Sequence, residues 1–175
     1  PTKLYYEGNK EYANQNIEDS FLLALAEGGF QVGELAKYYY AVGHMIGSLN
    51  YAEALAETNK LLQKDRFIIY EAAVQCDNFF VRTDILIKDN DRIKLIEVKA
   101  KSVDFASEED FLNKSGAIIP AWHAYLYDVA FQKYVLMKAF PGYKVSAYLM
   151  MADKNALCPT DGLNQKFKLN KNEQG

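Results

Sequence analysis

The chain has 175 residues, of which 50% are hydrophobic and 14% aromatic. This length and apolar content suit one globular domain with a hydrophobic core, and they exclude an intrinsically disordered chain. No stretch has the length and apolar character of a transmembrane segment, and the N-terminus lacks a signal-peptide pattern. Two cysteines, Cys76 and Cys158, are too few for a four-thiolate metal site. We therefore expect a cytoplasmic protein with no membrane partner and, because it begins at Pro1, one cut from a longer polypeptide.

The net charge is −3, with 20 Lys and Arg against 23 Asp and Glu, which argues against indiscriminate nucleic-acid binding. The charges are segregated along the chain. Residues 1–59 carry 3 basic and 8 acidic groups, whereas residues 133–171 carry 7 basic and 2 acidic groups. This pattern fits either one basic face on an acidic domain or lysines scattered over a solvated surface.

Three helices are predicted before any strand. The apolar spacing over 16–29 indicates a helix that ends at the Gly pair at 28 and 29, and a second helix follows directly over 30–43. A third helix is expected over 50–64, where Asn50 is a candidate N-cap and Glu53 lies three residues later.

From residue 66 the hydrophobic period changes from that of a helix to that of a strand. Runs of β-branched and aromatic residues at 66–75, 78–88 and 92–102 are separated by short turns, so we expect three consecutive antiparallel strands. After an irregular acidic stretch, a helix is predicted over 120–140 and a fourth strand over 143–152.

This order of elements predicts an α+β or three-layer α/β/α domain. Because the chain contains no repeat and no linker composition, we expect a single domain over 1–175. Its expected parts are a helical region over 1–64, a core of sheet and helix over 66–152, and a polar tail over 153–175.

The strands at 78–88 and 92–102 have a defined register if Asn90 and Asp91 form a two-residue turn. Opposed residue numbers then sum to 181, so Asp84 lies opposite Glu97. By the period of two, the same face carries Arg82 opposite Lys99, Phe80 opposite Lys101 and Leu86 opposite Leu95, and the other face pairs Ile85 with Ile96, Thr83 with Val98 and Val81 with Ala100. One face is therefore predicted to be core, and the other to hold two carboxylates among several cations.

Asp84 and Glu97 allow two interpretations. Like charges opposed across a ladder are destabilising, so in the first interpretation each carboxylate takes a cationic partner of its own, for which Arg82 and Lys99 are candidates. Alternatively the two carboxylates bind a hard divalent cation, since Mg²⁺ uses one or two protein carboxylates and completes its coordination with water and substrate phosphate. Lys99 then lies on the same face as Glu97, where it can neutralise a scissile phosphate or polarise a water.

The segment "RTDILIKDNDRIKLIEVKAKS" resembles the catalytic hairpin of the PD-(D/E)XK nuclease superfamily, with Asp84, Glu97 and Lys99 at its motif positions. The segments "GGFQVGELAKYYY", "YLYDVAFQKYVL" and "AYLMMADK" are similar to those of its RecB-like branch and of an uncharacterised bacterial nuclease-like family. The resemblance implies a restriction-endonuclease-like core, namely a mixed sheet of about four strands flanked by helices, with the antiparallel hairpin carrying the motif.

The resemblance also implies a catalytic set of Asp84, Glu97, Lys99 and Gln132. The cofactor would be Mg²⁺ or Mn²⁺, bound by Asp84, Glu97, the main-chain carbonyl of Val98 and Glu34. Two positions depart from the RecB-like pattern, because Lys37 replaces a His and Leu136 replaces a Tyr. Glu34 is therefore the candidate third ligand, with His44 as a weaker one, and a solvent-facing role for Glu34 is an equal alternative.

The remaining candidates flank this site. Glu71 is an acid in an apolar strand, and it either points into the site or lies solvated at a sheet edge. Gln132 forms a polar stripe with Asp128 and Tyr125 on the long helix, and the alternative role for Gln132 is to cap a buried carbonyl. The candidate phosphate contacts are Arg82, Lys88, Lys101 and Lys133.

The function predicted from these residues is metal-dependent hydrolysis of DNA, including single-stranded DNA, in repair, recombination or defence. The alternative is an inactive nuclease-fold module that binds nucleic acid or a partner protein within a longer polypeptide.

Overall fold

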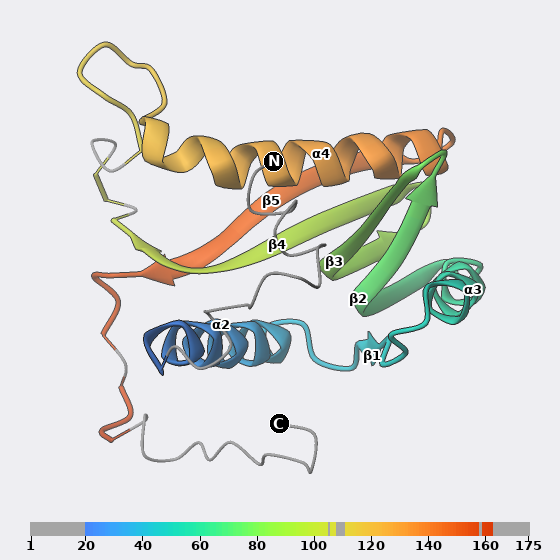
Figure 1. The fold of residues 1–175 in the computed structure, drawn as a ribbon, viewed down its shortest axis with the longest axis horizontal. Helices are drawn as coiled ribbons and strands as arrows, with labels where there is room; N and C mark the ends of the chain where they lie inside the picture. The colour runs from blue at the N-terminus through green and yellow to red at the C-terminus, as the bar shows by residue number, and fades with distance from the viewer. Residues whose placement is uncertain (1–19, 105, 108–110, 158, 163–175) are drawn as a thin grey trace, which may run out of the picture.

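The computed structural model describes residues 20–104, 106–107, 111–157 and 159–162, with side chains from residue 28 onward (Figure 1). Within these residues the elements, in chain order, are α2 (Ser20–Tyr38), β1 (His44–Met45), α3 (Tyr51–Leu61), β2 (Arg66–Cys76), β3 (Phe79–Asp89), β4 (Arg92–Val103), α4 (Pro120–Ala139) and β5 (Lys144–Asp153). The predicted tail beyond residue 162 and the start of the first predicted helix lie outside the described part of the chain.

The strands form one mixed sheet in the order β1-β2-β3-β4-β5. The three central strands are antiparallel, and the two edge strands are each parallel to their neighbour. Helix α4 runs along one side of the sheet and α2 along the other, while α3 packs against β2 (Figure 1). The predicted α+β class with a mixed sheet is confirmed, as are the three antiparallel strands, the long helix and the strand after it. Strand β1 was not predicted, because a strand of two residues is too short to give a periodic hydrophobic pattern.

The helical prediction before the sheet is partly wrong. The predicted break at Gly28 and Gly29 does not occur, because α2 is continuous from Ser20 to Tyr38. Glycine in a helix interior costs about 1 kcal/mol, which tertiary packing can offset. That packing is visible in the last turns, where Ala36 is 3% exposed and contacts Tyr70. Hydrophobic periodicity in the sequence does not show that the sheet will pack against this helix and stabilise it.

Helix α3 begins as predicted. The side chain of Asn50 accepts hydrogen bonds from the backbone N–H groups of Ala52 and Glu53, at 3.0 and 3.2 Å. The predicted capping box is not closed directly, because the N–H of Asn50 donates to Ser48 Oγ and Ser48 donates to the Glu53 carboxylate. Ser48 therefore relays the reciprocal bond that Glu53 would otherwise make.

The strand alternation sorts the sheet into two faces. Ile85 and Ile96 pack with Ala36 of α2, whereas Leu86 and Leu95 belong to the cluster that includes Val135 and Leu136 of α4. The next outward positions on the Leu86–Leu95 face are Asp84 and Glu97, since residues two apart share a face. The fold therefore directs the two motif carboxylates toward the side of the sheet that α4 covers.

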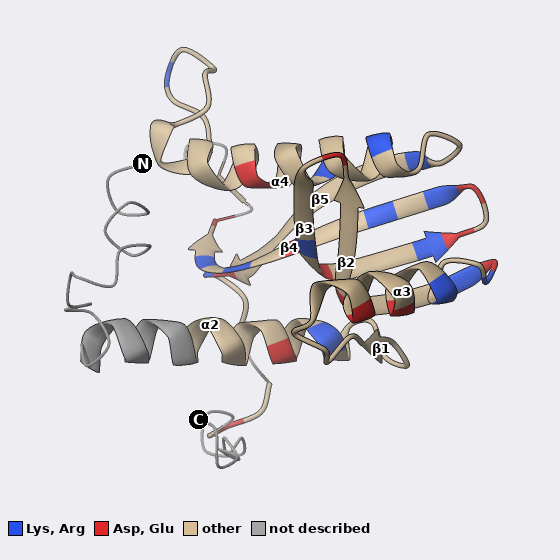
Figure 2. Ribbon diagram, turned by 45° about the vertical axis from the view of Figure 1, so that its right-hand side comes forward, with Lys and Arg blue, Asp and Glu red and all other residues tan. Residues whose placement is uncertain are grey.

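Positive charge gathers at one end of the molecule. Figure 2 shows Lys and Arg residues near the β3–β4 turn and at the C-terminal ends of α3 and α4. Asp84 lies five residues before the Asp89–Arg92 pair at that turn, a separation of about 17 Å along a strand. Most of this positive charge therefore lies away from the motif carboxylates.

Candidate functional site

The β3–β4 ladder ends where the motif begins. Its pairs run from Asp89–Arg92 to Ile85–Ile96, which confirms the predicted register over that stretch. The next contact is made by a side chain, because the N–H of Val98 donates to Asp84 Oδ2 at 2.7 Å. A carboxylate thus replaces the backbone acceptor of β3, and the two strands separate at this point.

The separation corrects the predicted pairs beyond it. Arg82 pairs with Ala73 of β2, while Lys99 pairs with Met151 of β5. The β3–β4 ladder contains none of the pairs predicted beyond Ile85–Ile96, because the two strands have separated there. The predictions that are wrong are Asp84–Glu97, Thr83–Val98, Arg82–Lys99, Val81–Ala100 and Phe80–Lys101.

Four side chains form a closed ring of hydrogen bonds beside this opening. Lys99 Nζ donates to Glu97 Oε1 at 2.5 Å and to Asp128 Oδ2 at 2.9 Å. Gln132 Nε2 donates to Glu97 Oε2 at 2.8 Å and to Asp128 Oδ1 at 3.0 Å. Each carboxylate thus receives one bond from the ammonium and one from the amide. We call Glu97, Lys99, Asp128 and Gln132 the β4–α4 ring, because each element supplies two members.

The pKa values of the two motif carboxylates, Asp84 and Glu97, are both raised above their usual range. Burial raises the pKa of Glu97, and the neighbouring Asp84 adds to this effect, while hydrogen bonds from Lys99 and Gln132 oppose it. Burial also raises the pKa of Asp84; the Val98 N–H opposes this shift, and Glu71 adds to it by repulsion. Both groups therefore gain from any positive charge placed between them.

In the other two charged groups, Asp128 and Lys99, the pKa shift favours the ionised form. Burial alone would raise the pKa of Asp128, but the hydrogen bonds from Lys99 and Gln132 bring it below its usual range. Burial alone would lower the pKa of Lys99, but its bonds to Asp128 and Glu97 raise it well above its usual range. Lys99 is therefore a permanently charged ammonium in this arrangement.

Glu71 stands beside Asp84 on the next strand. It interrupts the β2–β3 ladder between the pairs Tyr70–Ile85 and Ala72–Thr83, and its φ of 56° is left-handed. Such a backbone costs a non-glycine residue about 1–3 kcal/mol and is concentrated at functional sites. Of the two alternatives predicted for Glu71, the structure has the one near Asp84, and its carboxylate accepts a hydrogen bond from Arg82 at 3.3 Å.

The charges and oxygens of this site suit a divalent cation. Four carboxylates, those of Glu71, Asp84, Glu97 and Asp128, face the two cations Lys99 and Arg82, which leaves an excess of two negative charges. Gln132 Oε1 is buried without a hydrogen-bond partner in the described structure. Among the described residues no three His, Cys, Asp or Glu side chains converge as a ready-made metal cage. At most two of these carboxylates would therefore bind one ion together, which is the number that Mg²⁺ uses when it keeps several waters.

The structure does not bring the two predicted third ligands to this site. Glu34 lies on α2, on the opposite side of the sheet from α4 (Figure 1), and its exposed carboxylate accepts from Lys37 at 2.5 Å. His44 is exposed in β1 and pairs with Glu57 at 2.5 Å. The prediction that either residue supplies a third ligand is wrong, because sequence spacing carries no information on which side of the sheet a helix packs.

Two of the four predicted phosphate contacts, Lys88 and Arg82, instead bind groups of the protein itself. Lys88 is 6% exposed, and its Nζ donates to the carbonyls of Leu62 and Lys64 at 2.8 and 2.7 Å. Arg82 donates to the carbonyls of Ser48 and Ile46 as well as to Glu71. Both cations hold the region between α2 and β2 against the sheet, so neither is available to a phosphate.

The other two predicted phosphate contacts remain candidates. Lys101 Nζ lies over the ring of Trp122, 3.9 Å from its centroid, and Trp122 is 3% exposed, as expected for a packing residue. Lys133 is half-buried on α4, next to Gln132 in sequence. Asp128 was predicted only as part of the polar stripe with Gln132, and the sequence assigned it no role in the site. Its signal was the i, i+4 spacing with Gln132, which places both side chains on one face of α4.

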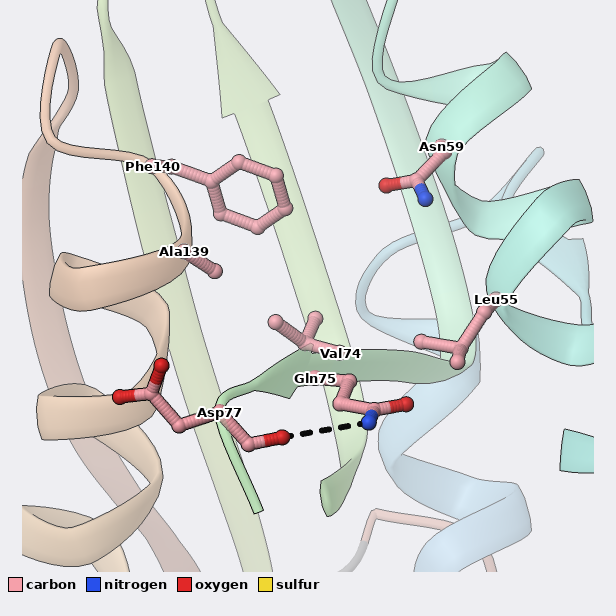
Figure 3. Close-up of a pocket in the computed structure, with 7 residues that line it drawn as sticks. All are labelled: Leu55, Asn59, Val74, Gln75, Asp77, Ala139 and Phe140. Carbon is pink, nitrogen blue, oxygen red and sulfur yellow. Dashed lines mark hydrogen bonds between the residues drawn. The ribbon is translucent and has the colours of Figure 1, made fainter. Parts of the chain in front are cut away.

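A pocket of about 420 Å³ lies elsewhere, at the tip of the β2–β3 hairpin (Figure 3). It is lined by residues of α3, β2 and the end of α4, namely Leu55, Asn59, Val74, Gln75, Asp77, Ala139 and Phe140. No predicted site residue lines it. A second pocket of about 410 Å³ lies at the end of α2 and includes Glu34.

A scan against protein-family models matched no family, and searches of curated proteins and of solved structures found no match. Among the described residues, no helix has both the length and the apolar character needed to cross a bilayer.

Proposed function

We propose that this chain is a metal-dependent nuclease that hydrolyses DNA phosphodiester bonds on a restriction-endonuclease-like core of the PD-(D/E)XK type. The observation that carries the proposal is the placement of Asp84, Glu97 and Lys99 where β3 and β4 separate, with an excess of two negative charges around them. The resemblance of the hairpin sequence to that superfamily supports the same assignment. The cellular setting that we propose is cytoplasmic DNA repair, recombination or defence, within a longer polypeptide.

Asp84, Glu97 and the main-chain carbonyl of Val98 would hold Mg²⁺ or Mn²⁺. When bound, such an ion acts as a Lewis acid on the phosphate and lowers the pKa of water to supply a nucleophile. The fit rests on the raised pKa values of both carboxylates, which a bound cation would lower.

Lys99 serves as a fixed positive charge. Because its partners raise its pKa, it does not remove a proton from water near neutral pH. Its contribution is electrostatic, since an ammonium beside the scissile phosphate stabilises the negative charge that develops on the phosphate oxygens in the transition state. Gln132 orients the Glu97 carboxylate, and Lys101 and Lys133 supply contacts to the DNA backbone.

The test is hydrolysis of plasmid and single-stranded DNA by the purified chain with Mg²⁺ or Mn²⁺, compared with EDTA. Glu97→Gln and Lys99→Met should abolish cleavage. Lys94→Met is the matched control for the second variant, because Lys94 is an exposed lysine on the same strand. Equal activity of wild type and both variants, or cleavage that persists in EDTA, would show that the proposed site is not the source of hydrolysis.

One observation favours the alternative of an inactive binding module. Both oxygens of Glu97 already accept hydrogen bonds from Lys99 and Gln132, so this carboxylate is satisfied by the protein itself. A module of this kind would bind DNA equally in EDTA and in Mn²⁺, and the Lys99→Met variant would leave that binding unchanged.

A further inference from the structure

Asp128 has the same partners as Glu97 but a different setting. Each accepts one hydrogen bond from Lys99 and one from Gln132. The Glu97 side chain is 8% exposed, whereas that of Asp128 is 40% exposed and lies on α4. Asp128 therefore keeps contact with water, while Glu97 depends on the ring for its partners.

A cation that binds Glu97 shares this carboxylate with the ring. An ionised carboxylate has two oxygens with about four acceptor sites, and each oxygen of Glu97 already accepts one hydrogen bond. The contact that a cation opposes most strongly is the one from Lys99, because two positive charges would then share one oxygen. Once that contact is lost, Lys99 retains its 2.9 Å bond to Asp128.

We propose that Asp128 is a positioning residue, which holds Lys99 while Glu97 exchanges the ammonium for the divalent cation. The inference rests on the proposed function, since it concerns the same site. With Asp128 present, Lys99 moves off Glu97 and stays beside the place of the scissile phosphate. Without the Asp128 carboxylate, Glu97 is the one carboxylate bonded to Lys99 in the described structure, so the ammonium competes with the cation for it.

Two properties of the ring support this division of roles. Asp128 and Gln132 are one turn apart on α4, and their mutual bond of 3.0 Å fixes the carboxylate toward Lys99. The contact between Lys99 and Asp128 joins residues 29 positions apart, so it ties α4 to β4 independently of Glu97.

The experiment is a double-mutant cycle read by Mn²⁺ affinity, measured by titration calorimetry on the whole chain. The variants are Asp128→Asn, Lys99→Met and their combination, with Asp77→Asn as a matched control for the loss of one exposed carboxylate. Asp128→Asn should weaken Mn²⁺ binding about tenfold in the wild-type background and less than about threefold in the Lys99→Met background. Asp128→Glu, which restores a carboxylate, should recover most of the affinity.

The cycle separates the role through Lys99 from a direct effect of charge. Equal weakening by Asp128→Asn in both backgrounds would overturn the proposal, because Asp128 would then attract the cation by itself. A wild-type chain that binds Mn²⁺ and cleaves DNA, with Asp128→Asn indistinguishable from Asp77→Asn, would overturn the role of Asp128 and leave the proposed function standing. A wild-type chain that neither binds Mn²⁺ nor cleaves DNA would overturn both. Denaturant unfolding in EDTA shows whether the Asp128→Asn chain is folded. If it is not folded, Asp128→Glu tests the proposal instead: Mn²⁺ affinity equal to that of the wild type supports a carboxylate role at this position, and a loss of affinity overturns it.

Discussion

Removing the ammonium from the β4–α4 ring should destabilise the metal-free fold. The substitution Lys99→Met keeps the aliphatic stem and deletes the group that bonds to Glu97 at 2.5 Å and to Asp128 at 2.9 Å. Gln132 then remains as the one ring donor to both carboxylates. Because the Glu97 side chain is 8% exposed, its charge cannot recover hydration without a local opening of the structure.

The magnitude follows from how much of the pair is buried. Leaving one member of a buried ion pair without its partner costs about 3–5 kcal/mol. Asp128 is 40% exposed and recovers water, so the full cost applies to the Glu97 half only. We therefore expect a loss of about 2–3 kcal/mol in the free energy of unfolding. For a chain of 175 residues this corresponds to a decrease in Tm of about 5–10 °C.

The loss should depend on pH. Without Lys99, the pKa of Glu97 rises further above 4.5, because the ammonium had lowered it. A carboxyl group with a raised pKa in the folded state binds more protons there than in the unfolded state, so the free energy of unfolding decreases as pH rises through that interval. The stability that Asp128 gains from Lys99 is likewise present above pH 3.8 and is lost as pH falls through its lowered pKa. The deficit of Lys99→Met is therefore largest near neutral pH and shrinks toward pH about 4.

The assay is urea unfolding in EDTA at a series of pH values, with Lys94→Met as the control. Lys94 is exposed on the same strand, so its substitution should stay within about 0.5 kcal/mol of the wild type. If the two variants lose the same stability at neutral pH, or if the Lys99→Met deficit grows as pH falls, the reasoning about the buried ring is wrong.

Substitutions at three further positions test structural roles away from the ring. Lys88→Met should lower the free energy of unfolding by about 2 kcal/mol without changing DNA binding, because the buried ammonium holds two backbone carbonyls; denaturant unfolding and DNA titration measure the two effects. Gly43→Ala should cost about 2 kcal/mol or more in the same unfolding assay, since a Cβ there would collide with the Tyr70 ring. Asn50→Ala should cost about 1 kcal/mol through loss of the α3 cap, and Asn50→Asp should restore it.

The sequence predicted the parts of the fold that depend on local pattern. The two-residue turn at Asn90 and Asp91, together with the alternation of inward and outward side chains such as Ile85 and Leu86, predicted the register of β3 against β4. The structure has that register from Asp89–Arg92 to Ile85–Ile96. The same pattern placed Glu97 on a common face with Lys99. These predictions succeed because a shift of one residue would move every apolar side chain of the hairpin to the opposite face.

The remainder of the site depends on features without a local signal. The ladder ends at Ile85–Ile96 because the carboxylate of Asp84 takes the N–H of Val98, and the left-handed Glu71 interrupts the pairing on the other side of β3. A register counted from the turn assumes an uninterrupted ladder, so it predicts neither the end of the β3–β4 pairing nor the interruption at Glu71. The role of Asp128 likewise requires knowing that α4 crosses the sheet over β4, which is a tertiary property.

The competition between Lys99 and a cation leads to one more prediction. Deleting the ammonium raises the excess negative charge around Asp84 and Glu97 from two to three, so Lys99→Met should bind Mn²⁺ at least as tightly as the wild type while being inactive on DNA. A cation at 100 times its Kd stabilises the folded state by about 2.7 kcal/mol, which matches the deficit expected from losing Lys99. Mn²⁺ should therefore restore the Tm of Lys99→Met, and it should not restore that of Asp84→Asn combined with Lys99→Met. If Mn²⁺ leaves the Tm of Lys99→Met unchanged, the ammonium and the cation do not share Glu97, and the site is a structural ion-pair network instead.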